Sequence, residues 1–237
     1  MRRRYLVVDD NRAYAENLAE ILEGNGSDAV IFTSAESTLA AGNTHRFDAL
    51  VTDIRMSGMN GVGLLHALRA TDPGLPALMM SAYSDDAALE LARQEGLLAV
   101  LPKPVPLRQL LALLQAARRG GLVAVVEDNL ALRDNLTEVL RMHGFTSVSV
   151  DSAHAALQLE CTRPFAAVVD VRLPDAPDGA GVDALNRRFP GVPVIAMSAY
   201  DVAASLQGTF VEFLPKPFVT SSLVALLDGL YRQQSVS

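Results

Sequence analysis

The sequence predicts two consecutive α/β domains of the doubly wound class, each a five-stranded parallel sheet with helices on both faces. Two observations support this prediction. The two halves of the sequence are similar to each other, and in each half short apolar runs alternate with amphipathic segments. Continuous apolar strands separated by helices are typical of a parallel sheet that is covered on both faces. The length of 237 residues suffices for two ordinary domains.

The duplication is visible in four segments of the first half that return, in the same order, in the second half. They are YLVVDDN at 5–11 and VAVVEDN at 123–129, FDALVTDIR at 47–55 and FAAVVDVR at 165–172, PALMMSAYSD at 76–85 and PVIAMSAYD at 193–201, and LPKP at 101–104 and 214–217. Asp53 and Asp170 lie 117 positions apart, as do Ser81 and Ser198. This period is the size of a domain and too long for a solenoid repeat.

The expected strands of the first copy are five apolar runs, at 4–8, 28–32, 47–52, 76–81 and 98–102. Helical spacing of apolar residues lies between them, as in Tyr14, Leu18, Ile21 and Leu22. The second copy repeats this order and closes with the helical pattern Leu223, Leu226, Leu227 and Leu230.

The joint between the copies is the segment RRGG at 118–121. We expect the last helix of the first copy to reach about Arg119 and the first strand of the second copy to begin near Leu122. These limits give domains at 1–119 and 120–237. Two glycines form a hinge or a helix stop, so the connection is short.

Composition and charge exclude several classes of protein. The net charge is −7, and there is no basic patch beyond Arg2 to Arg4, so we expect no direct nucleic-acid binding. No apolar run reaches the roughly 18 residues of a membrane span, and the first run stops at Asp9, too early for a signal peptide. A lone cysteine, Cys161, excludes an internal disulfide and fits a reducing cytoplasm.

The repeated polar residues all fall at the carboxyl ends of expected strands, where open parallel sheets bind their ligands. In the first copy they are Asp9, Asp10, Asp53, Ser81 and Lys103. In the second copy they are Glu127, Asp128, Asp170, Ser198 and Lys216. In each copy we therefore expect three carboxylates, one hydroxyl and one ammonium to lie together in one pocket.

Crowded carboxylates repel one another unless a cation lies among them, and oxygen ligands suit Mg²⁺, so we expect one ion in each domain. The ammonium and hydroxyl then serve as ligands for an anion. A carboxylate beside Mg²⁺, Lys and Ser can attack phosphorus and form an aspartyl phosphate.

Lysine usage supports this chemistry. Of the 20 basic residues only Lys103 and Lys216 are lysine, and both stand in LPKP. Lysine is a compact point charge, whereas arginine is a wide planar fork, so a tight pocket around one phosphoryl group favours lysine. The flanking prolines restrict the backbone, and the isomer of each Lys–Pro bond stays open at this point.

Simpler explanations exist for part of the pattern. Asp10 and Asp128 also suit the N-cap of the following helix, and the two serines also suit caps or turns. The lysines also suit solvated loops. Asp53 and Asp170 resist such explanations, because each follows an apolar run and burial of an unpartnered carboxylate is costly.

Taken together, these motifs resemble two tandem receiver domains of bacterial two-component response regulators. The acidic pair, the DxRM–(S/P)–xxxG loop, the SAY segment and LPKP are similar to the signature of that family across essentially the whole chain. The resemblance implies a flavodoxin-like (βα)5 fold for each copy. It also implies phosphoryl transfer to Asp53 and Asp170 from a phosphohistidine on a sensor histidine kinase or phosphotransfer protein.

Further roles are implied by the same resemblance. Direct metal ligation falls to Asp10 and Asp128, and ligation partly through water to Asp9 and Glu127. The metal site is completed by the backbone carbonyls of Arg55 and Arg172, which stand two residues after the phosphoacceptors. The phosphoryl oxygens are bound by the hydroxyls and ammonium groups of Ser81, Ser198, Lys103 and Lys216.

The two copies depart from the family pattern in different places. The position of the aromatic switch, three residues before the lysine, holds Phe213 in the second copy and Val100 in the first. The first copy has Ser57 where the family usually has proline, and the second has Pro174. The Ser-to-Lys spacing is 22 in the first copy and 18 in the second, about one helical turn shorter, so we expect different partners.

Both copies also place an arginine two residues after the phosphoacceptor and a tyrosine two residues after the serine, Tyr83 and Tyr200. In the family these positions flank the water that removes the phosphoryl group. One hypothesis is that arginine and tyrosine stack over the phosphoryl group and prolong its lifetime. The alternative is that the tyrosines cap an exposed edge.

The chain ends soon after its last expected helix, so we expect a stand-alone cytoplasmic regulator without an output domain. It would signal to a downstream protein target through protein–protein contacts, a phosphorelay or a homodimer. One alternative is a scaffold in which one receiver is unphosphorylated. Another is a haloacid-dehalogenase-like phosphatase, an enzyme that needs an acid where Arg55 and Arg172 stand.

Overall fold

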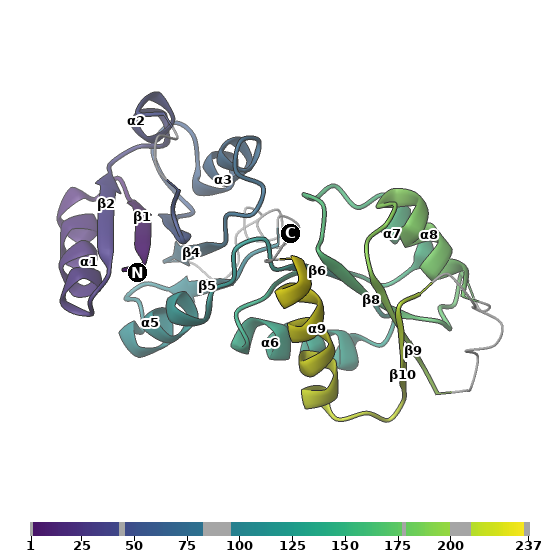
Figure 1. Cartoon of the computed structure of the whole chain (residues 1–237). Helices are drawn as coiled ribbons and strands as arrows, with labels where there is room; N and C mark the ends of the chain where they lie inside the picture. Colours follow the sequence, from purple (N-terminus) through teal and green to yellow (C-terminus); the bar gives the residue numbers. More distant parts are fainter. Residues whose placement is uncertain (1, 43–45, 83–95, 177–178, 200–209, 235–237) are drawn as a thin grey trace. The chain divides into compact units, whose positions relative to one another are not determined.

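A computed structural model describes residues 2–42, 46–82, 96–176, 179–199 and 210–234. The chain divides into two compact units, unit one at Met1–Gly120 and unit two at Gly121–Ser237 (Figure 1). None of the helices in the described part of the chain is long and apolar enough to cross a membrane.

Unit one is a parallel sheet with helices packed on both faces. Its elements are β1 (Arg4–Val8), α1 (Arg12–Gly24), β2 (Asp28–Phe32), α2 (Ala35–Ala40), β3 (Ala49–Asp53), α3 (Gly61–Arg69), β4 (Ala77–Ser81), β5 (Ala99–Pro102) and α5 (Leu107–Ala116). The strand order is β2-β1-β3-β4-β5, and all four neighbouring pairs are parallel. The five strands expected from the apolar runs are confirmed.

Unit two repeats this plan. Its elements are β6 (Leu122–Val126), α6 (Leu130–Met142), β7 (Thr146–Val150), α7 (Ala153–Leu157), β8 (Ala166–Asp170), α8 (Ala180–Arg188), β9 (Val194–Ser198), β10 (Glu212–Pro215) and α9 (Thr220–Gln234). Its strand order, β7-β6-β8-β9-β10, is that of unit one. The doubly wound fold of both copies is therefore confirmed.

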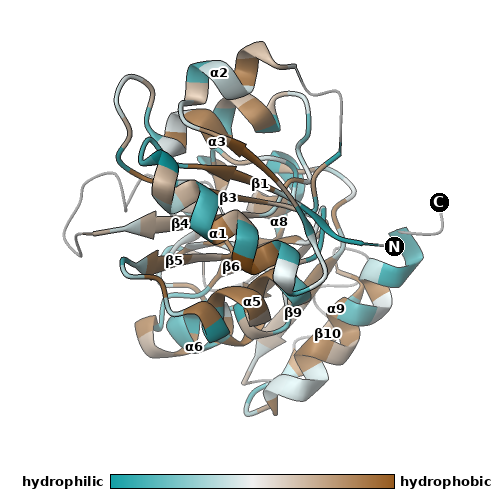
Figure 2. Ribbon diagram, turned by 90° about the vertical axis from the view of Figure 1, so that its left-hand side faces the viewer, coloured by the Kyte–Doolittle hydropathy of each residue, from teal (hydrophilic) through white to brown (hydrophobic). Residues whose placement is uncertain are grey.

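The first strand of unit one shows how the apolar runs build two cores. Tyr5 and Val7 pack with side chains of α1 and α5, whereas Leu6 and Val8 pack on the opposite face with α2 and α3. All four are at most 1% exposed. Strand residues alternate between faces, so a strand covered on both faces must be apolar throughout. Figure 2 shows brown along the middle of β1 and β3.

The end of unit one differs from the sequence expectation. We expected the last helix to reach about Arg119, but α5 ends at Ala116, because Ala117 adopts an extended conformation with ψ 132°. The guanidinium of Arg119 instead donates to the Phe47 carbonyl and pairs with Asp72. A helix signal in the sequence does not reveal such a tertiary hydrogen bond.

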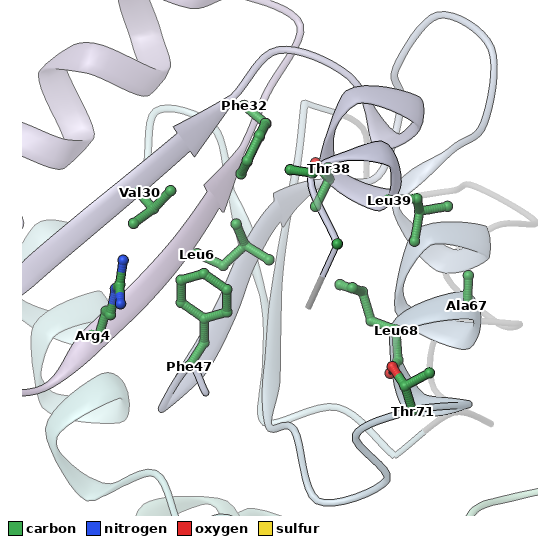
Figure 3. A pocket seen from close by; sticks show the side chains of 12 residues that line it. Arg4, Leu6, Val30, Phe32, Thr38, Leu39, Phe47, Ala67, Leu68 and Thr71 are labelled. Carbon is green, nitrogen blue, oxygen red and sulfur yellow. The ribbon is translucent and has the colours of Figure 1, made fainter. Parts of the chain in front are cut away.

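A cavity of about 340 Å³ opens on the α2–α3 face of unit one (Figure 3). It exists because α2 has only six residues, so β2 stays half-buried. The guanidinium of Arg4 stacks at its edge, 5.4 Å from the centroid of the Phe47 ring. The lining includes none of the acids at the strand ends, so this cavity is separate from the site described below.

The start of α3 approaches the end of β3 so closely that only glycine fits. A Cβ added at Gly61 would lie 2.2 Å from the backbone oxygen of Asp53. The Gly61 N–H donates to the Ile54 carbonyl at 3.0 Å, which holds the two segments together. A Cβ at Gly63, two residues along the same helix, would meet only side chains, at 3.1 Å or more.

We therefore predict that Gly61→Ala lowers the free energy of unfolding by about 1–3 kcal/mol, because overpacking displaces the β3 backbone. Gly63→Ala is the matched control and should change it by less than about 1 kcal/mol, since alanine favours the helix and the Met59 side chain can move. Urea denaturation followed by circular dichroism measures both. Equal stability of the two variants would contradict the close approach.

Candidate functional site

The polar residues repeated in the sequence gather at the carboxyl ends of the strands in each unit. In unit one, Asp9 follows β1, Asp53 ends β3 and Ser81 ends β4. Lys103 directly follows β5, and its backbone N–H donates to the Ser81 carbonyl at 2.8 Å. Parallel strands carry their last residues to one edge of the sheet, which explains why side chains far apart in sequence meet here.

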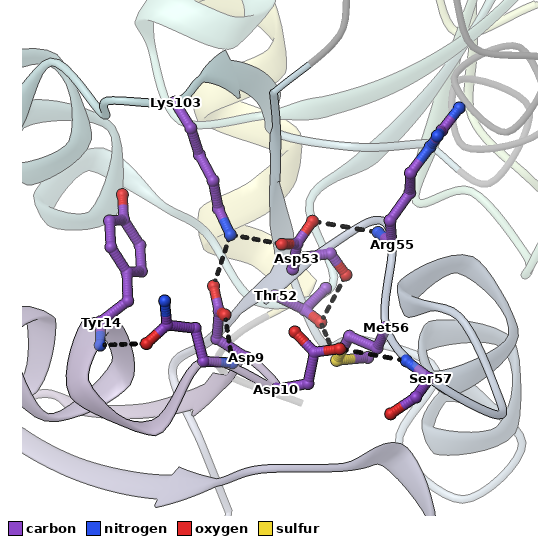
Figure 4. A network of polar contacts seen from close by, with 10 residues as sticks. Asp9, Asp10, Tyr14, Thr52, Asp53, Arg55, Met56, Ser57 and Lys103 are labelled. Atoms are coloured by element: carbon purple, nitrogen blue, oxygen red, sulfur yellow. Dashed lines mark hydrogen bonds and ion pairs between the residues drawn. The ribbon is translucent and has the colours of Figure 1, made fainter.

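A lysine bridges two carboxylates in unit one (Figure 4). The ammonium of Lys103 lies 2.7 Å from Oδ2 of Asp9 and also pairs with Oδ2 of Asp53. Backbone N–H groups hold the other oxygens: Asn11 donates to Asp9 Oδ1 and Arg55 donates to Asp53 Oδ1, both at 3.0 Å. The side chain of Asp9 is 0% exposed, so its charge depends on these partners.

Unit two builds the same bridge from its own residues. The ammonium of Lys216 lies 2.7 Å from Oε2 of Glu127 and 2.7 Å from Oδ2 of Asp170. Asn129 N–H donates to Glu127 Oε1 at 3.3 Å, and Arg172 N–H donates to Asp170 Oδ1 at 2.9 Å. Glu127 therefore pairs with Lys216 as Asp9 pairs with Lys103 in unit one, although its side chain is longer by one methylene group.

The backbone has the same conformation at both lysines. The peptide bonds Lys103–Pro104 and Lys216–Pro217 are cis, which resolves the isomer that the sequence left open. The Lys216 N–H donates to the Ser198 carbonyl at 2.7 Å, as Lys103 does in unit one. The side chains of Ser81 and Ser198 are buried, at 6% and 1% exposure, beside the lysines.

The pKa values of the bridged groups reflect burial and mutual charge. Burial raises the pKa of the Asp9 and Glu127 carboxyls above their ordinary values, against the hydrogen bond that each receives from its lysine. Burial alone would lower the pKa of Lys103 and Lys216, but hydrogen bonds to two carboxylates prevail and raise it. Each ammonium therefore stays charged at neutral pH.

The second acid of each pair is not a helix cap. Asn11 caps α1 by accepting from the Tyr14 N–H at 3.1 Å, and Asn129 caps α6 by accepting from the Leu132 N–H at 3.0 Å. The N-cap explanation for Asp10 and Asp128 is therefore wrong. Both of these acids are exposed.

Three carboxylates of each unit form a group that could hold a metal ion. Oxygens of Asp9, Asp10 and Asp53 all lie within 4.8 Å of one another. The same holds for the group of unit two, which is Glu127, Asp128 and Asp170. Three carboxylates and one ammonium leave a formal charge of −2, which one divalent cation balances. The donor set, all oxygen, suits Mg²⁺.

The two units hold the loop after the third strand of each sheet, β3 or β8, differently. In unit one, Ser57 N–H donates to Asp10 Oδ2 at 3.2 Å. Pro174 stands at the matching place in unit two and has no N–H, so Asp128 lacks this donor.

The contact between this loop and the short helix beside it also differs. Glu36 of α2 accepts from the Met59 N–H at 2.9 Å. In unit two the acid is on the loop: Asp175 accepts from the N–H groups of Ala153 and His154 at 3.1 and 2.9 Å. These backbone hydrogen bonds lower the pKa of both the Glu36 and the Asp175 carboxyls.

The positions of the aromatic switch are both half-buried but differ in packing. Phe213 packs against Phe210, with ring centroids 6.4 Å apart, and against Val171, which directly follows Asp170. Val100 instead joins the apolar cluster on the α2–α3 face of unit one.

Other predicted residues are placed only in part. Arg55 and Arg172 donate their backbone N–H groups to Asp53 and Asp170, and both arginine side chains are exposed. Tyr83 and Tyr200 lie outside the described residues, as does the segment where the Ser-to-Lys spacing differs, so the stacking hypothesis stays a prediction.

Sequence reasoning missed one neighbour of the site. Tyr14, first identified only as an apolar helix position, lies with its ring centroid 4.7 Å from the ammonium of Lys103. The repeat search could not find it, because unit two has Leu132 at the matching place.

We predict that Lys216→Met lowers the free energy of unfolding by about 1–3 kcal/mol in metal-free buffer, because Glu127 and Asp170 are left without a cation. Adding Glu127→Gln to this variant should recover most of the loss, since it removes the buried charge. Urea denaturation with EDTA present measures both. A single variant as stable as the wild type would show that the bridge is not structural.

Comparison with known proteins identifies the family of both units. A family model for the response regulator receiver domain matches residues 5–115 and 123–228. Both matched regions are therefore receiver domains, and neither is an enzymatic output domain. This finding favours the receiver interpretation over the phosphatase alternative.

Individual relatives agree. A response regulator receiver protein of Anaeromyxobacter sp. (strain Fw109-5) is 47% identical over 234 residues, covering 98% of this chain and 97% of that protein. The DNA-binding response regulator MtrA of Mycobacterium tuberculosis (strain ATCC 25618 / H37Rv) is 34% identical over 119 residues, covering 50% of this chain and 52% of MtrA. A receiver protein structure from Pseudomonas putida is 33% identical with a TM-score of 0.44, covering 47% of this chain and 93% of that one.

Proposed function

The chain belongs to the response regulator receiver family of two-component signalling, and on that premise we propose that both of its units are phosphoacceptors. Asp53 and Asp170 would each receive a phosphoryl group from a phosphohistidine, with Mg²⁺ bound in each unit. The observation that carries this proposal is the repeated bridge of one lysine between a buried acid and the aspartate that ends the third strand.

The geometry supports the aspartates at the ends of β3 and β8 as nucleophiles. Each has one oxygen held by a backbone N–H and the other paired with a lysine, so the carboxylate is held in one orientation. Asp53 is only partly buried, and Asp10 beside it is exposed, so a donor can reach the edge of the site. A fixed, charged nucleophile at an accessible edge is what phosphoryl transfer requires.

The proposed transfer is a single displacement at phosphorus. A carboxylate oxygen of Asp53 or Asp170 forms a bond to phosphorus while the bond from phosphorus to the imidazole nitrogen breaks. The electron pair of the broken bond stays on the donor histidine. Lys103 or Lys216 would move from its acid partner to the phosphoryl oxygens, and the hydroxyl of Ser81 or Ser198 would donate to them.

The acids of each unit would hold the metal, Asp9, Asp10 and Asp53 in unit one and Glu127, Asp128 and Asp170 in unit two. The backbone carbonyls of Arg55 and Arg172 would add one ligand each. Bound Mg²⁺ would supply positive charge next to the phosphoryl oxygens. The formal charge of −2 at each site supports this assignment.

The partners follow from the chemistry. The donor would be a sensor histidine kinase or a histidine phosphotransfer protein, and the output would pass to a downstream protein or along a phosphorelay. Because the loops next to Asp53 and Asp170 are held by different contacts, the two units would present different surfaces. The alternative is a scaffold in which one receiver stays unphosphorylated, and the experiment below separates the two.

Intact-protein mass after incubation with acetyl phosphate and Mg²⁺ tests the proposal. We predict two added phosphoryl groups on the wild-type chain. Asp53→Asn and Asp170→Asn should each leave one, and the double variant none. EDTA should abolish both additions, since the metal is needed to offset the negative charge of the site.

Each contrary result has a definite meaning. A single addition that disappears in one Asn variant would support the scaffold alternative and name the silent unit. Additions that persist in the double variant would refute both phosphoacceptors.

A further inference from the structure

We propose that Tyr14 is a positioning residue that holds Lys103 over its ring, and that unit two lacks this device. The ammonium of Lys103 lies 4.7 Å from the centroid of the Tyr14 ring, and the aromatic side chain stands next to the Lys103 stem (Figure 4). A cation near an aromatic face is attracted by the negative charge of that face. The proposal of a kinetic effect rests on the proposed function, whereas the placement of Lys103 does not.

The ring is a partner that metal binding would leave in place. Lys103 is otherwise held by Asp9 and Asp53, and both carboxylates belong to the group that could ligate a cation. Lysine has a flexible stem of four carbons, so an ammonium that loses a carboxylate can turn away. Tyr14 offers no carboxylate to the metal and keeps Lys103 at the site.

Tyr14 is itself fixed at two points. Its N–H donates to the capping side chain of Asn11 at 3.1 Å, which sets the start of α1. Its side chain packs against the apolar cluster that includes Val105, two residues after Lys103. The tyrosine therefore connects α1 with the segment that carries the lysine, and this packing limits the movement of its ring.

Unit two has the same backbone and a different side chain. Leu132 stands three residues after the cap Asn129, as Tyr14 stands three after Asn11, and its N–H is bound in the same way at 3.0 Å. Leu132 packs into the apolar cluster of α6 and α9. Leucine has no aromatic face to offer Lys216, whose ion pairs within the described part of unit two are those with Glu127 and Asp170, each at 2.7 Å.

The scarcity of lysine gives a direct test of placement. The chain contains two lysines, so lysine labelled with carbon-13 at Cε gives two side-chain NMR signals. The ring current of Tyr14 should shift the Lys103 signal upfield of the Lys216 signal, and Lys216→Gln assigns the pair. Tyr14→Leu, which installs the residue of unit two, should bring the two signals together, whereas Tyr14→Phe should keep them apart.

The kinetic consequence is measured in an Asp170→Asn background, where only Asp53 reports. Tyr14→Leu should slow phosphorylation of Asp53 by acetyl phosphate about two- to fivefold, and Tyr14→Phe should retain most of the rate. In a Lys103→Met background, Tyr14→Leu should have no further effect, because the tyrosine acts through the lysine.

The outcomes separate this inference from the proposed function. Overlapping lysine signals in the wild type, or equal losses of rate in the leucine and phenylalanine variants, would overturn the positioning role. An undiminished effect of Tyr14→Leu in the Lys103→Met background would overturn it as well. A parent protein that accepts no phosphoryl group at Asp53 would instead overturn the proposed function, and the NMR test would still decide the placement of Lys103.

Discussion

One ammonium group held between two carboxylates is the constraint on which each unit of this protein depends. Asp9 and Glu127 are 0% and 1% exposed, and a buried carboxylate without a partner is costly enough to unfold a small domain. Lysine neutralises the buried acid and also fixes the aspartate at the end of the third strand. The strand order, the buried first strand and the backbone course around Lys–Pro all serve to bring these three groups together.

The same bridge explains how a stable structure can also be a reactive one. Each site holds three carboxylates and one lysine, which pairs with two of them, so the site keeps a formal charge of −2. That excess negative charge favours a divalent cation, which would give the acids a new partner and offset the charge of a phosphoryl group. The lysine would then exchange a carboxylate for a phosphoryl oxygen.

Duplication preserved the bridge and changed its surroundings. Ser57 gives Asp10 a backbone donor, whereas Pro174 gives Asp128 none. The acid that joins the loop to the neighbouring short helix is on the helix in unit one and on the loop in unit two. Such differences leave the lysine bridge unchanged and alter the loop beside it in each receiver.

The fold and the meeting of the acids with the lysine could be predicted from the sequence because both depend on repeated patterns. Continuous apolar runs locate the strands, and parallel topology then places every strand-end acid at one edge. Contacts that occur in only one of the two units could not be predicted from the repeat. The contact of Tyr14 with Lys103 has no counterpart at Leu132, the matching place in unit two, and α5 ends at Ala116, after which Ala117 is extended and Arg119 binds Phe47.

The central claim is that both strand-end aspartates accept phosphoryl groups, and chemical mapping of the modified positions tests it most directly. Borohydride reduces an aspartyl phosphate to homoserine, so peptide mass mapping after treatment with acetyl phosphate, Mg²⁺ and borohydride identifies each acceptor. The account predicts conversion at Asp53 and at Asp170 and at no other aspartate. Conversion at a different aspartate, or at neither position, would contradict it.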